Sequence, residues 1–436
     1  MKPMPKKNDV ASVFGLGRSG RALVTHLVRT GVRVYAFDDA PQSALGDLPL
    51  WLSSLGVPFM AGGRGEARGD FVFRTPSMRP DSPVLCRAAL RGAVVMSEAE
   101  YFASLCPAPI YAVTGSDGKT TTATMLAGLL TRAGKRVYLG GNIGRSLLPF
   151  LDEMTERDAC VLELSSFQLS DMECPFYTGV VTNLTPNHLN WHKSLEEYTA
   201  AKKRLPLLST RRVLRRGLFE DFEAVRFSAD APSDFTVEGE TLFGMGIPLA
   251  STSDLCLCGK HNLENLLAAS AAAAPVVTPH DVREFARSFR GVKHRMETVG
   301  VIDGVRFINS SIDTTPSRTA VTLRALEEEG RLLLLLGGQG KKLSYEPLLS
   351  ALAERRALVF LFGETEEMLA KLFSERGIPF VSCGSLERAV SCAAEEAKRG
   401  DTVLLSPAAT SYDAFRDYEE RGERFCQLVN HLKRTE

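Results

Sequence analysis

One short run of residues, between an apolar stretch and a helical pattern ending near Ala133, constrains this chain most. The run Thr114-Gly115-Ser116-Asp117-Gly118-Lys119-Thr120-Thr121 has the composition of a loop that holds a triphosphate. Its backbone N–H groups can cradle phosphate oxygens, its lysine can reach the β and γ phosphates, and a threonine hydroxyl can bind Mg²⁺. A plain glycine-rich turn is the alternative. We therefore predict ATP-driven chemistry, with these candidate ATP contacts: Gly115, Ser116, Asp117, Gly118, Lys119, Thr120 and Thr121.

The spacing of this loop departs from the usual phosphate loop. The usual pattern places a glycine five residues before the glycine of the Gly-Lys pair, where this chain has Val113, and Gly115 lies only three before Gly118. This shortened form is the first sign that the chain differs from kinases and small GTPases.

Length and charge exclude several classes. With 436 residues and 44% hydrophobic composition, the chain can form about three domains, each with its own core. Lys plus Arg and Asp plus Glu both number 52, so no net basic field favours nucleic acid or an anionic membrane. No signal peptide or membrane span is evident in the sequence. We expect a cytoplasmic protein, a monomer, with neither nucleic acid nor membrane as partner.

The cysteines do not suggest a disulfide framework. There are nine, scattered along the chain, and no Cys-x-x-Cys pair. Cys256 and Cys258 could touch a metal, but two thiols are an incomplete ligand set, and buried reduced thiols are the alternative that we favour.

The chain opens with a βαβ pattern. A strand is predicted at Val10 to Phe14, followed by glycines at 15, 17 and 20, a helix to about Thr30, and a strand at Val32 to Phe37. Asp38 and Asp39 follow the glycines by about twenty residues, where a dinucleotide-binding fold places an acid on a ribose hydroxyl. Taken alone, this motif leaves a nicotinamide site as an open alternative.

Two further α/β segments follow a boundary near Ser97. Apolar strand patterns at 110–114, 159–164 and 179–183 and an alanine-rich helix at about 263–274 form the second, and 290–294 connects it to the third. The third contains continuous apolar runs at 331–336, 358–362 and 402–405, which are typical of buried parallel strands. The predicted fold class is therefore α/β, with a Rossmann-like domain at 1–97, a central phosphate-loop domain with a mainly parallel sheet at 98–294, and a second Rossmann-like domain at 295–436.

Residue chemistry alone adds a few candidates. Glu163 ends an apolar strand next to the loop and could bind Mg²⁺, although a solvated acid would fit the pattern as well. Ser194 to Glu197 forms a capping box that predicts a helix with Tyr198 and Lys202 on one face. By charge pattern, the basic run at 202–204 reads as a solvated face, and His188 reads as a structural loop residue.

Motifs from Gly15 to Arg421 together resemble the Mur ligases, and most closely the branch that adds D-glutamate. The resemblance rests on these segments: the shortened phosphate loop, Glu163 to Leu169, Asn183 to Asn190, Gly259 to Asn265, His294 to Glu297, Gly337 to Lys341 and Leu405 to Gly422. It implies amide-bond formation: ATP phosphorylates the carboxylate of UDP-N-acetylmuramoyl-L-alanine, and the amine of D-glutamate attacks the acyl phosphate. It also implies three domains that hold, in order, the UDP substrate, ATP and the amino acid.

The resemblance also implies roles for individual residues. The catalytic set is Lys119, His188 and Lys202. Two Mg²⁺ ions are implied, with Lys202 carbamylated by carbon dioxide, and the ligands are Thr120, Glu163, His188 and Lys202. Further ATP contacts are Asn262, Asn265 and Arg295. The implied UDP-substrate contacts are Arg18, Ser19, Asp38, Asp39, Asn142 and His188, and the implied D-glutamate contacts are Thr314, Lys341, Ser411 and Tyr418.

Some positions depart from the family pattern, and some alternatives stay open. Asn190 and Ser310 stand where relatives usually have Asp, Ile312 replaces a Lys, and Ala40 stands where relatives often have an Arg. Lys342 rivals its neighbour as the D-glutamate contact. An NAD-dependent oxidoreductase would explain the first glycines but not Lys119, and a nucleotide-binding switch would leave the third segment unexplained. A sister Mur ligase or a folylpolyglutamate synthase is the nearest competitor, and the run at 406–422 argues against both.

Overall fold

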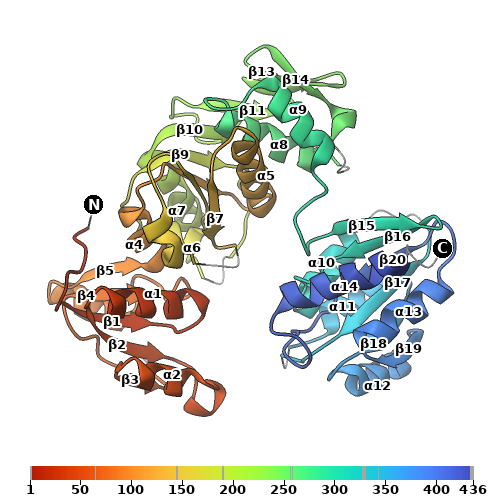
Figure 1. Ribbon diagram of the computed structural model, residues 1–436, viewed down its shortest axis with the longest axis horizontal. Coiled ribbons are helices and arrows are strands. Elements are labelled where there is room, and N and C mark those ends of the chain that lie inside the picture. Colours follow the sequence, from red (N-terminus) through yellow and green to blue (C-terminus); the bar gives the residue numbers. More distant parts are fainter. Residues whose placement is uncertain are drawn as a thin grey trace. The chain divides into compact units, whose positions relative to one another are not determined.

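The computed structural model describes residues 2–432, apart from positions 64, 144–145, 189–190, 256, 258, 327–329 and 342. By its contacts the chain divides into two compact units, 1–289 and 290–436 (Figure 1). Two sheets lie in the first unit and one in the second. Within the described residues, no helix is long and apolar enough to cross a membrane.

The first sheet has five parallel strands in the order β3-β2-β1-β4-β5. Its strands are β1 (Val10–Phe14), β2 (Arg33–Asp38), β3 (Phe59–Ala61), β4 (Phe71–Arg74) and β5 (Val94–Ser97). Its helices are α1 (Arg18–Arg29), η1 (Gln42–Ala44), α2 (Leu48–Ser54), α3 (Pro83–Leu90) and α4 (Glu98–Leu105). The predicted βαβ opening is confirmed, since β1 is apolar and buried and α1 buries Leu23, Val24 and Leu27 on one face.

The central sheet has nine strands in the order β14-β13-β12-β11-β10-β9-β6-β8-β7, parallel except at β12-β13-β14. Its strands are β6 (Ile110–Thr114), β7 (Val137–Gly141), β8 (Ala159–Glu163), β9 (Phe176–Val181), β10 (Ser209–Arg215), β11 (Val225–Ser228), β12 (Phe235–Glu238), β13 (Thr241–Gly244) and β14 (Ile247–Ser251). Its helices are α5 (Lys119–Arg132), η2 (Leu148–Glu153), α6 (Ser166–Leu169), α7 (Leu195–Leu208), η3 (Thr252–Asp254), α8 (Lys260–Ala273) and α9 (Pro279–Ser288).

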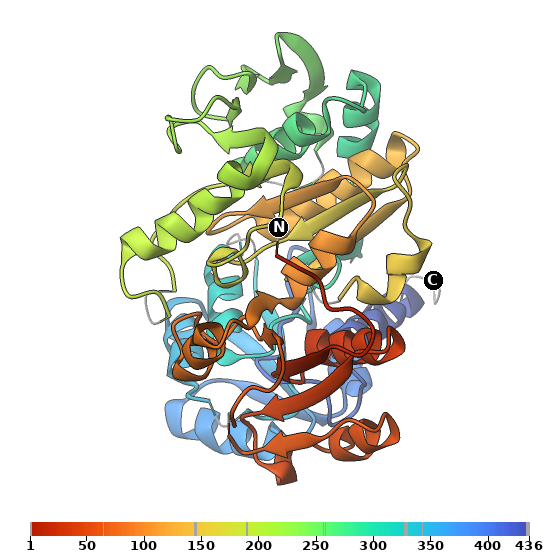
Figure 2. The same ribbon diagram turned by 90° about the vertical axis from the view of Figure 1, so that its left-hand side faces the viewer.

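The position of the phosphate loop is set by the strand before it and by the helix after it. All of β6 is buried between β9 and β8, so the loop after it leaves the middle of the sheet at the carboxyl ends of parallel strands. Figure 1 shows α5, which follows the loop, packed beside the alanine-rich α8. In Figure 2 the yellow-green α7 lies at one side of the central sheet, where it contacts β9.

The second unit has a six-stranded sheet in the order β15-β16-β20-β17-β18-β19, in which only β15 is antiparallel. Its strands are β15 (Glu297–Ile302), β16 (Val305–Asn309), β17 (Leu332–Gly337), β18 (Ala357–Phe362), β19 (Phe380–Gly384) and β20 (Thr402–Leu405). Its helices are α10 (Pro316–Ala325), α11 (Glu346–Glu354), α12 (Glu366–Arg376), α13 (Leu386–Glu396) and α14 (Tyr418–Leu432). The three apolar runs predicted as buried parallel strands correspond to β17, β18 and β20. These strands pair in parallel and are largely buried, so the prediction is confirmed.

A buried arginine joins the first sheet to the central sheet inside the first unit. Arg74, at the end of β4, is 2% exposed. It donates to the carboxylate of Asp171 from Nε at 2.9 Å, to the Phe167 carbonyl at 2.9 Å, and to Ser170 Oγ at 3.2 Å. Its guanidinium also donates to the Met78 carbonyl at 3.2 Å. One side chain therefore fixes the loop after β4 to the turn after α6.

Replacing Arg74 with methionine should destabilise the first unit by about 3–5 kcal/mol, because the change leaves a partly buried carboxylate without its partner. Both tryptophans of the chain, Trp51 and Trp191, lie in this unit, so their fluorescence during denaturant unfolding reports on it alone. Arg29→Met is the matched control. It removes the Arg29–Asp152 pair, whose side chains are 51% and 68% exposed, and should cost under about 1 kcal/mol. Equal unfolding midpoints for the two variants would contradict the role given to Arg74.

Candidate active site

The lysine of the phosphate loop folds back and hydrogen-bonds to the loop's own carbonyls. Gly118, at φ 75°, caps the amino end of α5, and a Cβ there would lie 2.3 Å from the Asn265 side-chain oxygen. Lys119 Nζ donates to the carbonyls of Gly115 at 3.0 Å and Ser116 at 2.7 Å. The loop therefore has the backbone conformation and the close approach that only glycine permits, with the lysine folded over it.

Asn183, which follows β9, supports the phosphate loop with its side chain. Its side-chain oxygen accepts from the N–H groups of Ser116 at 3.1 Å and Asp117 at 2.8 Å. Ser116 Oγ in turn lies 2.7 Å from the Tyr198 hydroxyl on α7. Two of the N–H groups that were predicted to bind phosphate therefore donate to Asn183, a residue for which the sequence predicted no role. The motif at 183–190 begins with this residue and could have pointed to it.

Glu163 lies beside the loop, at the end of β8. The side chain is 2% exposed, so the solvated-acid alternative does not hold. Thr120 Oγ1 donates to one carboxylate oxygen and Asn142 Nδ2 to the other, both at 2.7 Å. A threonine hydroxyl and a carboxylate in contact at a phosphate loop are oxygen ligands of the kind that Mg²⁺ prefers.

Lys202 is buried in spite of the basic run around it. α7 begins at Leu195, as predicted, but only half of the capping box forms: Ser194 accepts from the Glu197 N–H, while the Glu197 carboxylate binds the Lys193 N–H instead. Lys202 is 2% exposed and donates to the Gly115 carbonyl at 2.7 Å, with Nζ 4.9 Å from the centre of the Tyr198 ring. The solvated-face interpretation is therefore wrong for Lys202.

Two groups of this site are shifted toward their neutral forms. Burial, and then the charge of Lys119, lower the pKa of Lys202 to about 7. Burial, and then Lys119 and Lys202, also lower the pKa of His188. The His188 ring packs against the Phe167 ring at 5.0 Å, at a residue with φ 55°. A neutral imidazole is the form that can bind a metal, and a neutral amine is the form that can react with carbon dioxide.

No group of three or more His, Cys, Asp or Glu side chains able to hold a metal occurs among the described residues. The candidate magnesium ligands consist of one carboxylate, one histidine, one threonine and one lysine, so they do not form such a group. They fit Mg²⁺ only if the lysine contributes an oxygen.

The predicted adenine-nucleotide asparagines lie on α8. The helix begins at Lys260 with Gly259 as its cap, and Asn262 lies in its first turn. Asn265 is buried, and its side-chain oxygen accepts from the Thr122 hydroxyl at 3.1 Å, at the amino end of α5. Arg295 belongs to the second unit and is exposed.

The glycines after β1 open a cleft of about 270 Å³ on the first sheet, lined by residues that include Gly15, Gly17, Asp38 and Asp39. The Asp38 carboxylate accepts from the N–H groups of Leu16 at 2.8 Å and Ala40 at 2.9 Å. Asp38 therefore shapes the cleft. Arg18 and Ser19 begin α1, and Asn142 is exposed in the loop after β7, where it contacts Glu163.

The predicted D-glutamate residues lie at the carboxyl ends of the strands of the second unit. Lys341 Nζ donates to Thr314 Oγ1 at 3.2 Å. Ser411 is 2% exposed, and Tyr418 begins α14, with its carbonyl accepting from Ser311 Oγ at 2.8 Å. Ser310 is fully buried, and its hydroxyl accepts from the Met296 N–H at 3.3 Å, so it serves the fold. Asn190, Lys342, Cys256 and Cys258 lie outside the described residues.

Arg421 was not among the residues predicted to contact D-glutamate, although it lies in the same part of the second unit. It is fully buried and donates to the carbonyls of Ala409, Thr410 and Ser311. Burial lowers its pKa to about 10, and burial followed by the charges of Arg318 and Arg421 lowers the pKa of Lys341. Lys341, Arg318 and Arg421 place positive charge at this end of the sheet, which favours an anion.

A phosphate loop beside a buried acid, on the second of three α/β sheets in chain order, is typical of an ATP-using enzyme. Residues 113–211 match the model of the Mur ligase middle domain, and residues 294–409 match that of the Mur ligase, glutamate ligase domain. The fold is similar to that of UDP-N-acetylmuramate-alanine ligase from Thermotoga maritima, with a TM-score of 0.56 and 19% identity over 98% of this chain and 100% of that one.

Curated relatives are similar over nearly the whole chain. The UDP-N-acetylmuramoylalanine--D-glutamate ligase of Ruminiclostridium cellulolyticum is 37% identical over 98% of this chain and 97% of its own length. The protein of the same name from Acetivibrio thermocellus is 38% identical, with the same coverage. The chain belongs to the Mur ligase family, in the group of the UDP-N-acetylmuramoylalanine--D-glutamate ligases.

Proposed function

We propose that this chain uses ATP to join D-glutamate to UDP-N-acetylmuramoyl-L-alanine, with release of ADP and phosphate. The observation that carries the proposal is the contact of Thr120 with the buried Glu163 beside a loop that Lys119 closes. It is supported by the positive charge around Lys341 and by relatives of this name that match nearly the whole chain.

The residues near the loop have separate tasks in this proposal. Lys119 would move from the loop carbonyls to the β and γ phosphates, which offer it stronger, charge-assisted partners. The transferred phosphoryl group would pass to the substrate carboxylate, because a free carboxylate is a poor electrophile. Mg²⁺, when bound, supplies the positive charge that offsets the charge of the transferred phosphoryl group. Thr120 and Glu163 would hold the first ion.

Lys202 and His188 would hold a second ion in this proposal. Carbamylation joins the neutral Nζ to carbon dioxide and releases one proton, which turns a buried cation into a carboxylate. Burial and the charge of Lys119 lower the pKa of Lys202, which favours the neutral amine that reacts with carbon dioxide. The other roles remain as predicted for ATP (Asn262, Asn265, Arg295), the UDP substrate (Arg18, Ser19, Asp38, Asp39, Asn142) and D-glutamate (Thr314, Lys341, Ser411, Tyr418).

Phosphate release from ATP in the presence of the nucleotide sugar tests this function. D-glutamate, L-glutamate, meso-diaminopimelate and L-lysine are added in turn. We expect release that requires both the sugar and D-glutamate, because the Lys341 end of the second unit suits an acidic amino acid. Release with lysine or diaminopimelate would contradict the proposed substrate. The domain bounds at 97 and 294, the monomeric state and the cytoplasmic location stay predictions.

A further inference from the structure

The loop after β4, residues 75–81, has a ligand cleft on one side. Thr75, Ser77 and Met78 line the cleft of the first sheet together with Asp38 and Asp39. In the function proposed above, this cleft takes the nucleotide sugar. Any ligand that fills it therefore touches this loop.

The other side of the same loop is bound to the segment that follows His188. Arg79 pairs with the Glu197 carboxylate at 2.8 Å, donates to the Trp191 carbonyl, and lies over the Trp191 ring, 4.9 Å from its centre. The Trp191 indole N–H donates to the Ser77 carbonyl at 3.0 Å. Arg79 is also held by Asp81 at 2.9 Å.

Residues 191–197 are connected to the ATP site by two sets of short contacts. The N–H groups of Trp191 and His192 both donate to the His188 carbonyl at 3.0 Å, and the Trp191 ring stacks on Phe167 at 4.5 Å. Glu197 lies in the first turn of α7, the helix that carries Lys202. The next residue, Tyr198, contacts the phosphate loop through Ser116.

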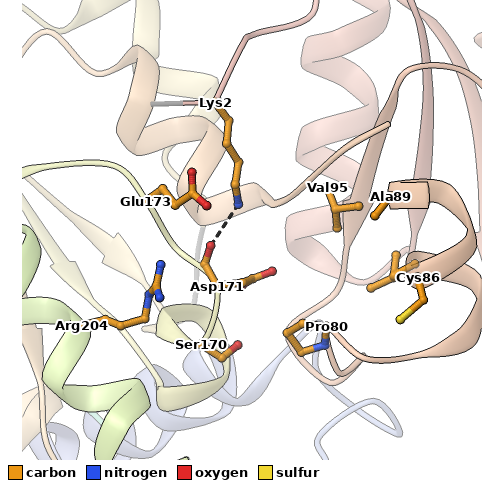
Figure 3. A pocket seen from close by; sticks show the side chains of 10 residues that line it. Lys2, Pro80, Cys86, Ala89, Val95, Ser170, Asp171, Glu173 and Arg204 are labelled. Atoms are coloured by element: carbon orange, nitrogen blue, oxygen red, sulfur yellow. Dashed lines mark hydrogen bonds between the residues drawn. The ribbon is translucent and has the colours of Figure 1, made fainter. Parts of the chain in front are cut away.

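Packing alone does not fix the loop. Figure 3 shows Pro80 of the loop at the wall of a cavity of about 370 Å³, across from Ser170 and Asp171. Met78 packs in the apolar core of the first sheet, but Pro80 borders the cavity, so the position of the Pro80 end of the loop depends on the polar contacts of Arg79. Arg74 is buried and structural, while the side chain of Arg79 is 24% exposed and touches the segment after His188.

We propose that Arg79 is a positioning residue that couples the cleft of the first sheet to the ATP site, by holding residues 75–81 against Trp191 and Glu197. The proposal rests on the function proposed above, because it assigns the nucleotide sugar to the cleft. A ligand in the cleft fixes the position of the loop. Through its contacts with Trp191 and Glu197, Arg79 then fixes the positions of His188 and of α7, the helix that carries Lys202. Binding of the sugar and binding of ATP should therefore be cooperative.

The test measures the dissociation constant of UDP-N-acetylmuramoyl-L-alanine with and without a non-hydrolysable ATP analogue. We expect the analogue to tighten sugar binding about fivefold or more in the parent chain. In Arg79→Ala this ratio should fall to about one, and kcat should fall about 10–100-fold, as for a misplaced catalytic group. Arg79→Lys keeps the pair with Glu197 but cannot also cover Trp191, so its ratio should lie between those two.

Lys193→Ala is the matched control. It removes an ion pair to Asp81 in the same network, but the Lys193 side chain is 72% exposed, so we expect the parent ratio. Parent-like ratios in both Arg79 variants would overturn the proposal and leave the proposed function intact. A parent chain that does not bind the sugar would overturn both. If Arg79→Ala fails to fold, the Arg79→Lys ratio decides.

Discussion

Lys119→Ala should lower the kcat for phosphate release about 10²–10³-fold at saturating substrates, with little change in stability. In the structure Lys119 donates to the carbonyls of Gly115 and Ser116, and the Gly115 carbonyl keeps its hydrogen bond from Lys202 when Lys119 is replaced. In the reaction the same ammonium would face the β and γ phosphates, where charge builds up. The loss should therefore fall on turnover.

Lys135→Ala is the control for Lys119→Ala. Lys135 follows the far end of α5, is partly exposed, and donates to the Arg157 carbonyl at 3.2 Å. Its removal takes one lysine from the same helix region without touching the loop, so turnover should match the parent. Turnover of Lys119→Ala within about tenfold of this control would contradict the role of the loop.

Lys202→Ala should also lose activity, by about 10²–10³-fold, and short carboxylic acids such as formate or acetate should restore part of it. The truncation opens a space beside the Gly115 carbonyl and the Tyr198 ring, next to the loop. A small carboxylate in that space could take the place of the carbamate proposed for Lys202. Initial rates over a range of acid concentrations measure the effect.

Lys203→Ala separates this effect from a general one. Lys203 is the next residue on α7, 37% exposed and paired with Asp221 at 2.7 Å. We expect its variant to keep full activity and to gain nothing from added acids. If acids leave Lys202→Ala inactive, the carbamate proposal is unsupported, although Lys202 could still act as an amine.

The strands and the loop could be predicted because their signals are local. The apolar runs predicted β1, β2, β17, β18 and β20 to within one residue at each end, whereas the run predicted at 179–183 belongs to β9, which begins three residues earlier, at Phe176. The glycines at 115 and 118 predicted a phosphate loop between a strand and a helix, and the structure places Gly118 at φ 75° where α5 begins. Ser194 correctly predicted the start of α7. Its expected partner Glu197 instead binds Arg79 and the Lys193 N–H, and the capping-box pattern holds no information on these contacts.

The environment of the charged residues could not be predicted from the pattern of charges. Lys202, Lys203 and Arg204 are equivalent in sequence, yet only Lys202 faces the phosphate loop, because α7 packs against β9 on that side. Arg421 stands among charged helix residues, and its burial depends on the carbonyls of Ala409 and Thr410 in the preceding loop and of Ser311, which is far away in the chain. Asn183 likewise supports the phosphate loop from just after β9, which is distant in sequence.

The most direct test of the account follows one oxygen atom. The nucleotide sugar is prepared with ¹⁸O in the carboxylate of its alanine and is turned over with ATP and D-glutamate, and the released phosphate is analysed by mass spectrometry. If ATP phosphorylates this carboxylate at the Lys119 loop, each phosphate released carries one ¹⁸O atom. Phosphate without label, released together with the amide product, would contradict activation of the carboxylate and with it the central claim.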